Sequence, residues 1–161
     1  MNTEPVRFLS DGESDTRKLA CKLADNLTEG LTVSLNGELG AGKTFFTRAL
    51  CAALGTDPSR VNSPTFVLLQ LYTDGRIPIA HFDTYRLADP EEFLAIGADE
   101  YLYDPLWLCV VEWAERVTEI LPADRIEINI HHSGEQQREF VIQATGTVSS
   151  DVLAAIRVCL E

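Results

Sequence analysis

The sequence is poor in the residues that hold polyanions by charge. Only three of its 161 residues are lysine, at positions 18, 22 and 43, and the formal net charge is −12. An acidic balance of this size argues against broad, non-specific binding to nucleic acid or to an anionic membrane. We therefore expect no direct binding to DNA, and any role in RNA chemistry to run through a basic partner.

Long apolar runs are also missing. No run approaches the roughly 20 residues that a membrane helix requires, and Met1–Phe8 lacks the apolar core of a signal peptide. None of the four cysteines (Cys21, Cys51, Cys109, Cys159) is spaced as C-x-x-C, so we expect buried thiols in a reducing compartment. These absences predict a cytoplasmic protein without membrane contact.

With 45% hydrophobic and 24% charged residues, the composition is that of a globular protein, and residues 1–161 are predicted to form one domain.

What the sequence does contain is a phosphate-binding loop. Residues 37–44, Gly-Glu-Leu-Gly-Ala-Gly-Lys-Thr, fit the pattern G-x-x-x-x-G-K-[ST] at every fixed position. The apolar, β-branched run 31–35 before it predicts a strand, and residues 45–54 after it predict a helix that ends at Gly55. The alternative is an ordinary glycine turn before a buried helix, but such a turn does not require a lysine and then a hydroxyl residue at the helix start.

The expected chemistry follows from this local geometry. Glycines let the backbone turn tightly and present a row of N–H donors, and the positive end of the new helix also favours an anion. Lys43 is predicted to reach the β- and γ-phosphates of a nucleotide, and Thr44 to give its hydroxyl to a bridging Mg²⁺.

A magnesium–nucleotide site also needs an acid at the end of a neighbouring strand. Glu112 ends the most apolar predicted strand, so it is our candidate magnesium ligand, either direct or through water. Asp83 ends another strand, and we assign it as a second-shell ligand or as the base that orients the attacking water. The alternatives are that Glu112 simply emerges into solvent and that Asp83 caps the turn at Thr84.

Several further residues have both a functional and a structural interpretation. Thr65, exposed after Pro64 at a strand start, is a candidate sensor of the γ-phosphate or else a β-forming turn residue. His81 is expected to be a packed or hydrogen-bonded strand histidine. Arg86 faces either phosphate or a nearby acid, and Trp113 packs either against the nucleotide or into the core.

The periodicities predict an α/β fold: a parallel β core around the loop, flanked by antiparallel strands and covered by helices on both faces. Strands are predicted at 5–8, 31–35, 66–72, 77–83, 106–112, 125–130 and 138–145. Helices are predicted at 15–27, 45–54, 90–96, 99–103, 115–121 and 149–160.

Four stretches together resemble the bacterial TsaE (YjeE) family. They are the loop at 37–44, Ser-Pro-Thr-Phe at 63–66, His-Phe-Asp-Thr-Tyr-Arg-Leu at 81–87 and Val-Glu-Trp at 111–113. The phosphate loop alone is shared by many NTPases, whereas the combination is far more specific. Their order and spacing and the chain length also match, so the resemblance covers nearly the whole chain. Family members often have a proline after Glu-Trp, where this chain has Ala114.

The resemblance implies a single-domain P-loop NTPase fold and a Mg²⁺-dependent ATPase that is weak alone and stimulated by partners. The family acts with TsaB and TsaD to form threonylcarbamoyladenosine (t6A) at adenosine 37 of tRNAs that read ANN codons, and is thought to reset the complex between turnovers. Contact with tRNA is then indirect. The motif match assigns ATP or ADP contact to Leu39, Gly40, Ala41, Gly42, Lys43 and Thr44, magnesium to Thr44 and Glu112, and a functional role to Asp83. It places the adenine near Glu13 and residues 133–138.

Two other functions are weighed against this one. A small-molecule kinase needs a second substrate pocket and usually a lid that carries arginine. Only residues 86–103 leave room for such a lid, and that segment is acidic. A GTPase-type switch needs an Asn-Lys-x-Asp guanine reader, which is absent; the nearest string, at 22–25, precedes the phosphate loop.

Overall fold

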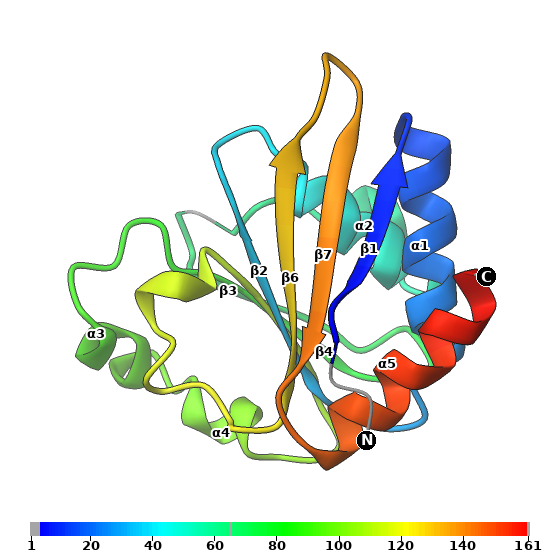
Figure 1. Cartoon of the computed structure of the whole chain (residues 1–161). Coiled ribbons are helices and arrows are strands. Elements are labelled where there is room, and N and C mark those ends of the chain that lie inside the picture. The colour runs from blue at the N-terminus through cyan, green and yellow to red at the C-terminus, as the bar shows by residue number, and fades with distance from the viewer. Residues whose placement is uncertain (1–3, 65, 161) are drawn as a thin grey trace.

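The computed structural model describes residues 4–64 and 66–160, which form a seven-stranded sheet with helices on both sides (Figure 1). The strands are β1 (Val6–Ser10), β2 (Thr32–Gly37), β3 (Leu69–Tyr72), β4 (Ile79–Asp83), β5 (Leu108–Glu112), β6 (Arg125–His132) and β7 (Arg138–Ala144). The helices are α1 (Glu13–Asp25), α2 (Lys43–Ala53), α3 (Pro90–Ala95), α4 (Asp99–Leu102) and α5 (Thr147–Leu160), with short 3₁₀ turns η1 (Pro58–Arg60) and η2 (Ala114–Arg116).

The sheet has a parallel centre and antiparallel edges. Its strand order is β1-β7-β6-β2-β5-β4-β3. β2 pairs in parallel with β5 and β6, and β4 pairs in parallel with β5. β3 pairs with β4, β6 with β7, and β1 with β7, all antiparallel. All five residues of β5 are buried, because a central parallel strand is covered on both faces. The predicted fold class is confirmed.

Two apolar clusters lie on opposite faces of the sheet. α1, α2 and α5 cover one face, and Phe46 of α2 packs there against Phe140 of β7 with ring centroids 5.7 Å apart. α3 and α4 lie on the other side in Figure 1, where Phe93 packs edge-on against Phe82 of β4 at 5.0 Å. Within the described residues, no helix has the length and hydropathy needed to cross a membrane.

Apart from shifts of one or two residues at element ends, two predicted elements differ from the structure. The strand predicted to begin at Phe66 begins at Leu69, because Leu68 has a φ of 68° and its N–H donates to the carbonyl of Pro64 in a turn. The helix predicted at 115–121 is only the 3₁₀ turn η2 followed by further turns. Its backbone bonds span three residues, and the Thr118 hydroxyl donates to the Ala114 carbonyl, competing with the regular helix ladder.

The expectation of four buried thiols is half correct. Cys51 and Cys109 are buried, and desolvation raises the pKa of each to about 12, so both remain protonated. Cys21 and Cys159 are exposed, contrary to the prediction. A cysteine on a helix is placed inside or outside by the face it occupies, which residue type alone does not reveal.

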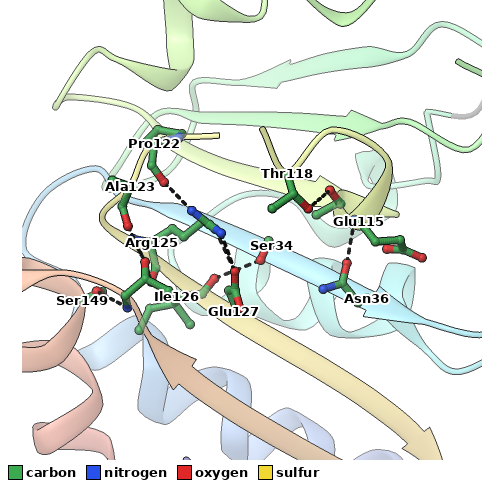
Figure 2. A network of polar contacts seen from close by, with 12 residues as sticks. Ser34, Asn36, Glu115, Thr118, Pro122, Ala123, Arg125, Ile126, Glu127 and Ser149 are labelled. Atoms are coloured by element: carbon green, nitrogen blue, oxygen red, sulfur yellow. Dashed lines mark hydrogen bonds and ion pairs between the residues drawn. The ribbon is translucent and has the colours of Figure 1, made fainter. Parts of the chain in front are cut away.

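Polar contacts hold the segment after β5 against the centre of the sheet. Figure 2 shows Asn36, near the end of β2, accepting a hydrogen bond from the backbone N–H of Glu115 in η2 at 3.0 Å. At the other end of the same view, the Arg125 guanidinium donates to Glu127 at 2.6 Å and to the Pro122 carbonyl at 2.9 Å. The turn that follows Glu112 is therefore tied to β2, the strand that leads into the glycine loop.

Asp124, the residue that precedes β6, caps the start of α5. Its carboxylate accepts from the N–H groups of Val148 at 2.8 Å and Ser149 at 2.9 Å, two donors of the first helical turn. Burial alone would raise the pKa of Asp124, but the hydrogen bonds from Ser149 and Val148 outweigh it and lower the pKa below its usual value. Its charge therefore stabilises the fold above the unfolded pKa, and this stability is lost as the pH falls through the lower folded pKa.

Replacing Asp124 with asparagine should lower the free energy of unfolding at pH 7 by about 1 kcal/mol. The difference from wild type should shrink as the pH falls below about 4, and it should vanish only once the pH has passed the lower folded pKa, where the Asp124 carboxyl of wild type becomes protonated. Urea unfolding between pH 7 and pH 2.5 measures it. Asp151→Asn, an exposed acid on the same helix, is the matched control and should leave the pH profile unchanged. A pH-independent difference for Asp124→Asn would contradict the charged-cap account.

Candidate functional site

The loop between β2 and α2 has the backbone of an anion-binding turn. Gly42, the residue before α2, is left-handed with a φ of 105°, and Gly40 has a φ of 80°. L-residues rarely adopt these angles, so glycine is needed at both positions. Ala41 between them is fully buried, while Leu39 on the loop is 78% exposed. The turn leaves the first N–H groups of α2 directed at the space in front of the loop.

The Lys43 side chain lies along the inside of this loop. Its Nζ donates to the carbonyls of Gly37 at 2.5 Å and Glu38 at 3.0 Å, and it stands 3.8 Å from the centre of the Trp113 ring. Desolvation by burial lowers the pKa of Lys43, and the nearby carboxylates, Glu112 foremost, act in the opposite direction. The amine is thus held beside the site by weak partners that a phosphate can replace.

Glu112 reaches the first turn of α2 from the end of β5. The Thr44 hydroxyl donates to Glu112 Oε1 at 2.7 Å, although the two residues are 68 positions apart in the chain. β5 is the parallel neighbour of β2, so its carboxyl end lies beside the loop that β2 feeds. Glu112 is only 2% exposed, which excludes the alternative that it merely emerges into solvent.

Asp83 ends the next strand, β4, directly opposite Glu112 in the parallel register. Its Oδ2 accepts from the Ser63 hydroxyl at 2.7 Å, and its Oδ1 accepts from the Tyr85 N–H at 2.9 Å. The second bond matches the alternative in which Asp83 caps the following turn. It is 2% exposed and also borders the cavity in front of the loop, so the capping hydrogen bond and a position on the cavity wall coexist.

These groups meet in a cavity of about 420 Å³. Its lining combines predicted and unpredicted residues: Leu39, Gly40, Gly42, Lys43, Thr44, Phe45, Ser63, Asp83, Tyr85, Glu112 and Trp113. A chamber of this volume has the size typical of small-molecule sites. The carboxyl ends of β4 and β5 and the start of α2 therefore bring most of the predicted site residues together.

Trp113 closes one side of the cavity in an unusual backbone conformation. Its φ of 60° is left-handed, which costs a non-glycine residue on the order of 1–2 kcal/mol. The conformation directs the indole over Lys43 and against Tyr85, whose ring lies 4.8 Å away. Trp113 thus lines the site rather than the core. Tyr85 and Ser63 also line the cavity and were not predicted as site residues, although each lies within two residues of a predicted one.

Glu13 lies on the other side of the loop. A second cavity, of about 160 Å³, is lined by Glu13, Ala41, Gly42, Phe45 and Arg138 among others, and Arg138 Nε donates to the Ala41 carbonyl at 3.1 Å. The start of α1 and the β6–β7 turn therefore flank the loop, while Glu13 does not line the larger cavity. The adenine contact assigned to Glu13 stays a prediction.

The predictions for three other residues compare differently with the structure. Thr65 lies outside the described residues, so its predicted role stays a prediction. His81 is a fully buried, hydrogen-bonded strand histidine as expected, and its partner is Glu112. The Arg86 guanidinium lies 4.4 Å from the centre of the Phe66 ring, a contact that neither alternative named, and its predicted role stays a prediction.

The sheet order, the glycine loop and the acids at the neighbouring strand ends define a P-loop NTPase fold. Residues 10–140 match the model of the family described as "Threonylcarbamoyl adenosine biosynthesis protein TsaE". The chain therefore belongs to the TsaE family, as its motifs indicated.

Individual relatives agree with this assignment. The tRNA threonylcarbamoyladenosine biosynthesis protein TsaE of Bacillus subtilis is 40% identical over 141 residues, which is 88% of this chain and 87% of the relative. Its counterpart in Treponema pallidum is 39% identical over 137 residues, 85% of this chain and 99% of the relative. The crystal structure of YdiB from Bacillus subtilis superimposes with a TM-score of 0.81 at 28% identity, covering 100% of this chain and 99% of that one.

Proposed function

We propose that this protein is the ATP-binding and ATP-hydrolysing subunit required for t6A formation at adenosine 37 of tRNAs that read ANN codons. In this proposal it acts in the cytoplasm with TsaB and TsaD, contacts tRNA only through them, and resets the complex between turnovers. The names of its relatives supply the pathway. The observation that carries the ATPase part is the Thr44–Glu112 hydrogen bond, which joins the phosphate loop to a buried acid in one cavity with Lys43 and Asp83.

The donor set suits magnesium. Mg²⁺ prefers oxygen ligands and is usually bound through one or two carboxylates together with substrate phosphates. The Thr44 hydroxyl and the Glu112 carboxylate provide two such oxygens, already in contact. When bound, the ion would neutralise charge on the phosphates. Among the described residues, no group of three or more His, Cys, Asp and Glu side chains is arranged to hold a metal ion.

The remaining roles follow from position. The loop residues Leu39 to Thr44 bind the phosphates, with Lys43 at the β- and γ-phosphates, and Trp113 covers that site. Asp83 orients or deprotonates the attacking water, or supports the magnesium from its second shell. Thr65, which lies outside the described residues, is proposed from the sequence alone to sense the γ-phosphate. Glu13 borders the base, because its cavity adjoins the loop at Ala41 and Gly42.

The small-molecule kinase receives less support. A kinase of this kind needs a lid that closes over a second substrate, and residues 86–103 are the only candidate segment. In the structure this segment carries α3 and α4, and it is anchored to the sheet by Phe93 and Leu102, both buried in the second apolar cluster. Opening it would expose these side chains to water.

Hydrolysis with and without partners tests the proposal. ATP turnover should be near zero for the purified protein and should rise when TsaB and TsaD from the same source are added. Activity that ignores TsaB and TsaD but increases with a small hydroxyl-bearing metabolite would overturn the proposal in favour of the kinase.

Glu112→Ala tests the magnesium ligand. The quantity to measure is the magnesium midpoint, defined as the Mg²⁺ concentration at which half of the Mg²⁺-induced gain in ATP affinity is reached. We expect the midpoint to rise by about 30-fold, within the range seen when metal-site ligands or their supports are lost. Affinity for ATP in EDTA should change little. Calorimetric titration measures both, and an unchanged midpoint would remove Glu112 from the metal site.

A further inference from the structure

A chain of buried polar side chains runs from the edge of the sheet to the candidate magnesium site. Tyr72 lies on β3, His81 on β4 and Glu112 on β5, three adjacent strands. Their exposed fractions are 2%, 0% and 2%. Polar groups buried this deeply are costly unless each is hydrogen-bonded, so their partners are a structural requirement.

The partners are found along the chain itself. His81 Nε2 is hydrogen-bonded to Glu112 Oε2, and His81 Nδ1 lies 3.1 Å from the Tyr72 hydroxyl. The Tyr72 hydroxyl also lies 2.8 Å from Gln70 Oε1 on the same strand. An ionised carboxylate only accepts hydrogen bonds, so His81 Nε2 is the donor to Glu112. The two oxygens of Glu112 are thereby divided, with Oε2 held by His81 and Oε1 by Thr44.

We propose that His81 is a positioning residue for the magnesium site: its Nε2–H fixes the Glu112 carboxylate so that Oε1 faces Thr44, and the Tyr72 hydroxyl fixes the imidazole. This inference rests on the proposed function and deepens it. It adds two residues, on β4 and on the edge strand β3, that touch neither nucleotide nor metal. Their effect on metal binding passes through the orientation of one carboxylate.

Glu112 needs such a positioning partner because a glutamate side chain has considerable conformational freedom. Glutamate has three rotatable bonds, and ordering such a side chain costs up to about 2 kcal/mol of conformational entropy. The hydrogen bond from His81 to Oε2 restricts rotation of the Glu112 carboxylate about its last side-chain bond before the metal binds. Loss of such outer supports typically reduces metal affinity by about 10- to 100-fold.

Three substitutions separate positioning from packing. His81→Leu removes the donor, His81→Gln keeps an amide N–H that reaches the place of Nε2, and Tyr72→Phe removes only the hydroxyl behind the ring. We expect the magnesium midpoint to rise about 10-fold in His81→Leu and about 3-fold in Tyr72→Phe, and to return to within about 3-fold of wild type in His81→Gln. The ATP affinity measured in EDTA should stay unchanged in all three.

A matched control comes from the same strand. Phe82, next to His81, is fully buried but belongs to the apolar cluster on the opposite face. Phe82→Leu should lower the melting temperature and leave the magnesium midpoint unchanged. If His81→Leu behaves like this control, or loses ATP affinity equally with and without Mg²⁺, the positioning role is overturned. Should His81→Leu fail to fold, Tyr72→Phe decides, and an unchanged midpoint in that variant overturns the proposal.

The same titration distinguishes this inference from the function it rests on. If the wild-type protein shows no ATP binding or no gain from Mg²⁺, the proposed function fails. If wild type responds to Mg²⁺ and Glu112→Ala shifts the midpoint while the His81 and Tyr72 variants do not, only the positioning role fails.

Discussion

Lys43→Ala is expected to reduce partner-stimulated ATP hydrolysis by about 100- to 1,000-fold, the usual cost of removing one charged donor from a preorganised site. The amine lies at the inner wall of the cavity, 5% exposed, and is held there by two loop carbonyls and the Trp113 ring. A phosphate offers a stronger, charge-assisted partner than either carbonyl. ATP affinity should fall as well, because the same contact exists in the ground state.

Steady-state hydrolysis and ATP titration measure the two effects. Lys18→Ala is the matched control, since Lys18 is an exposed lysine on α1 whose side chain is 72% accessible. It should leave both quantities unchanged. Lys43→Arg tests geometry, because a planar guanidinium keeps the charge but not the compact shape of the ammonium group. Full activity in Lys43→Ala would show that the loop is not the phosphate site.

Asp83→Asn is expected to lower kcat by at least about 100-fold while ATP affinity changes little. The amide keeps an oxygen that can accept from the Tyr85 N–H, so the turn after β4 should remain. It loses the negative charge that a base or a water-orienting group needs. The buried position opposite Glu112 keeps the charge in a low-dielectric setting, where its loss has a large effect.

The comparison of kcat with the magnesium midpoint decides between the two roles assigned to Asp83. A drop in kcat at an unchanged midpoint supports the base, whereas a raised midpoint supports a second-shell ligand. Ser63→Ala serves as a control for the hydrogen bond on Oδ2, and we expect a smaller loss, of about 10-fold or less. Normal turnover in Asp83→Asn would remove Asp83 from the catalytic step.

The local sequence pattern was sufficient to predict the phosphate loop. Glycine tolerates left-handed angles that other residues avoid, so the spacing of Gly40 and Gly42 before Lys43 already specifies the turn observed. The continuous apolar run of β5 also predicted a buried central strand, because a strand covered on both faces needs no alternation of apolar and polar residues. These signals depend only on neighbours in the chain.

Other features depend on which strands become neighbours. Tyr72, His81 and Glu112 form one hydrogen-bonded chain only because β3, β4 and β5 are adjacent in the sheet. The sequence predicted that His81 would be packed or hydrogen-bonded in a strand, but it did not identify Glu112 as a partner. The left-handed backbone conformation of Trp113 could not be predicted from the sequence either, because a tryptophan adopts it only when the surrounding structure imposes it.

The sequence by itself determined the phosphate loop, the buried strand before Glu112 and the acids at the strand ends, because each is encoded by residues that are close in the chain. Only the tertiary structure decided that Glu112 holds the Thr44 hydroxyl, that Tyr85 and Trp113 enclose the cavity, and that His81 supports the acid. Those contacts join residues tens of positions apart. They arise from strand order and register, which packing of the whole sheet selects.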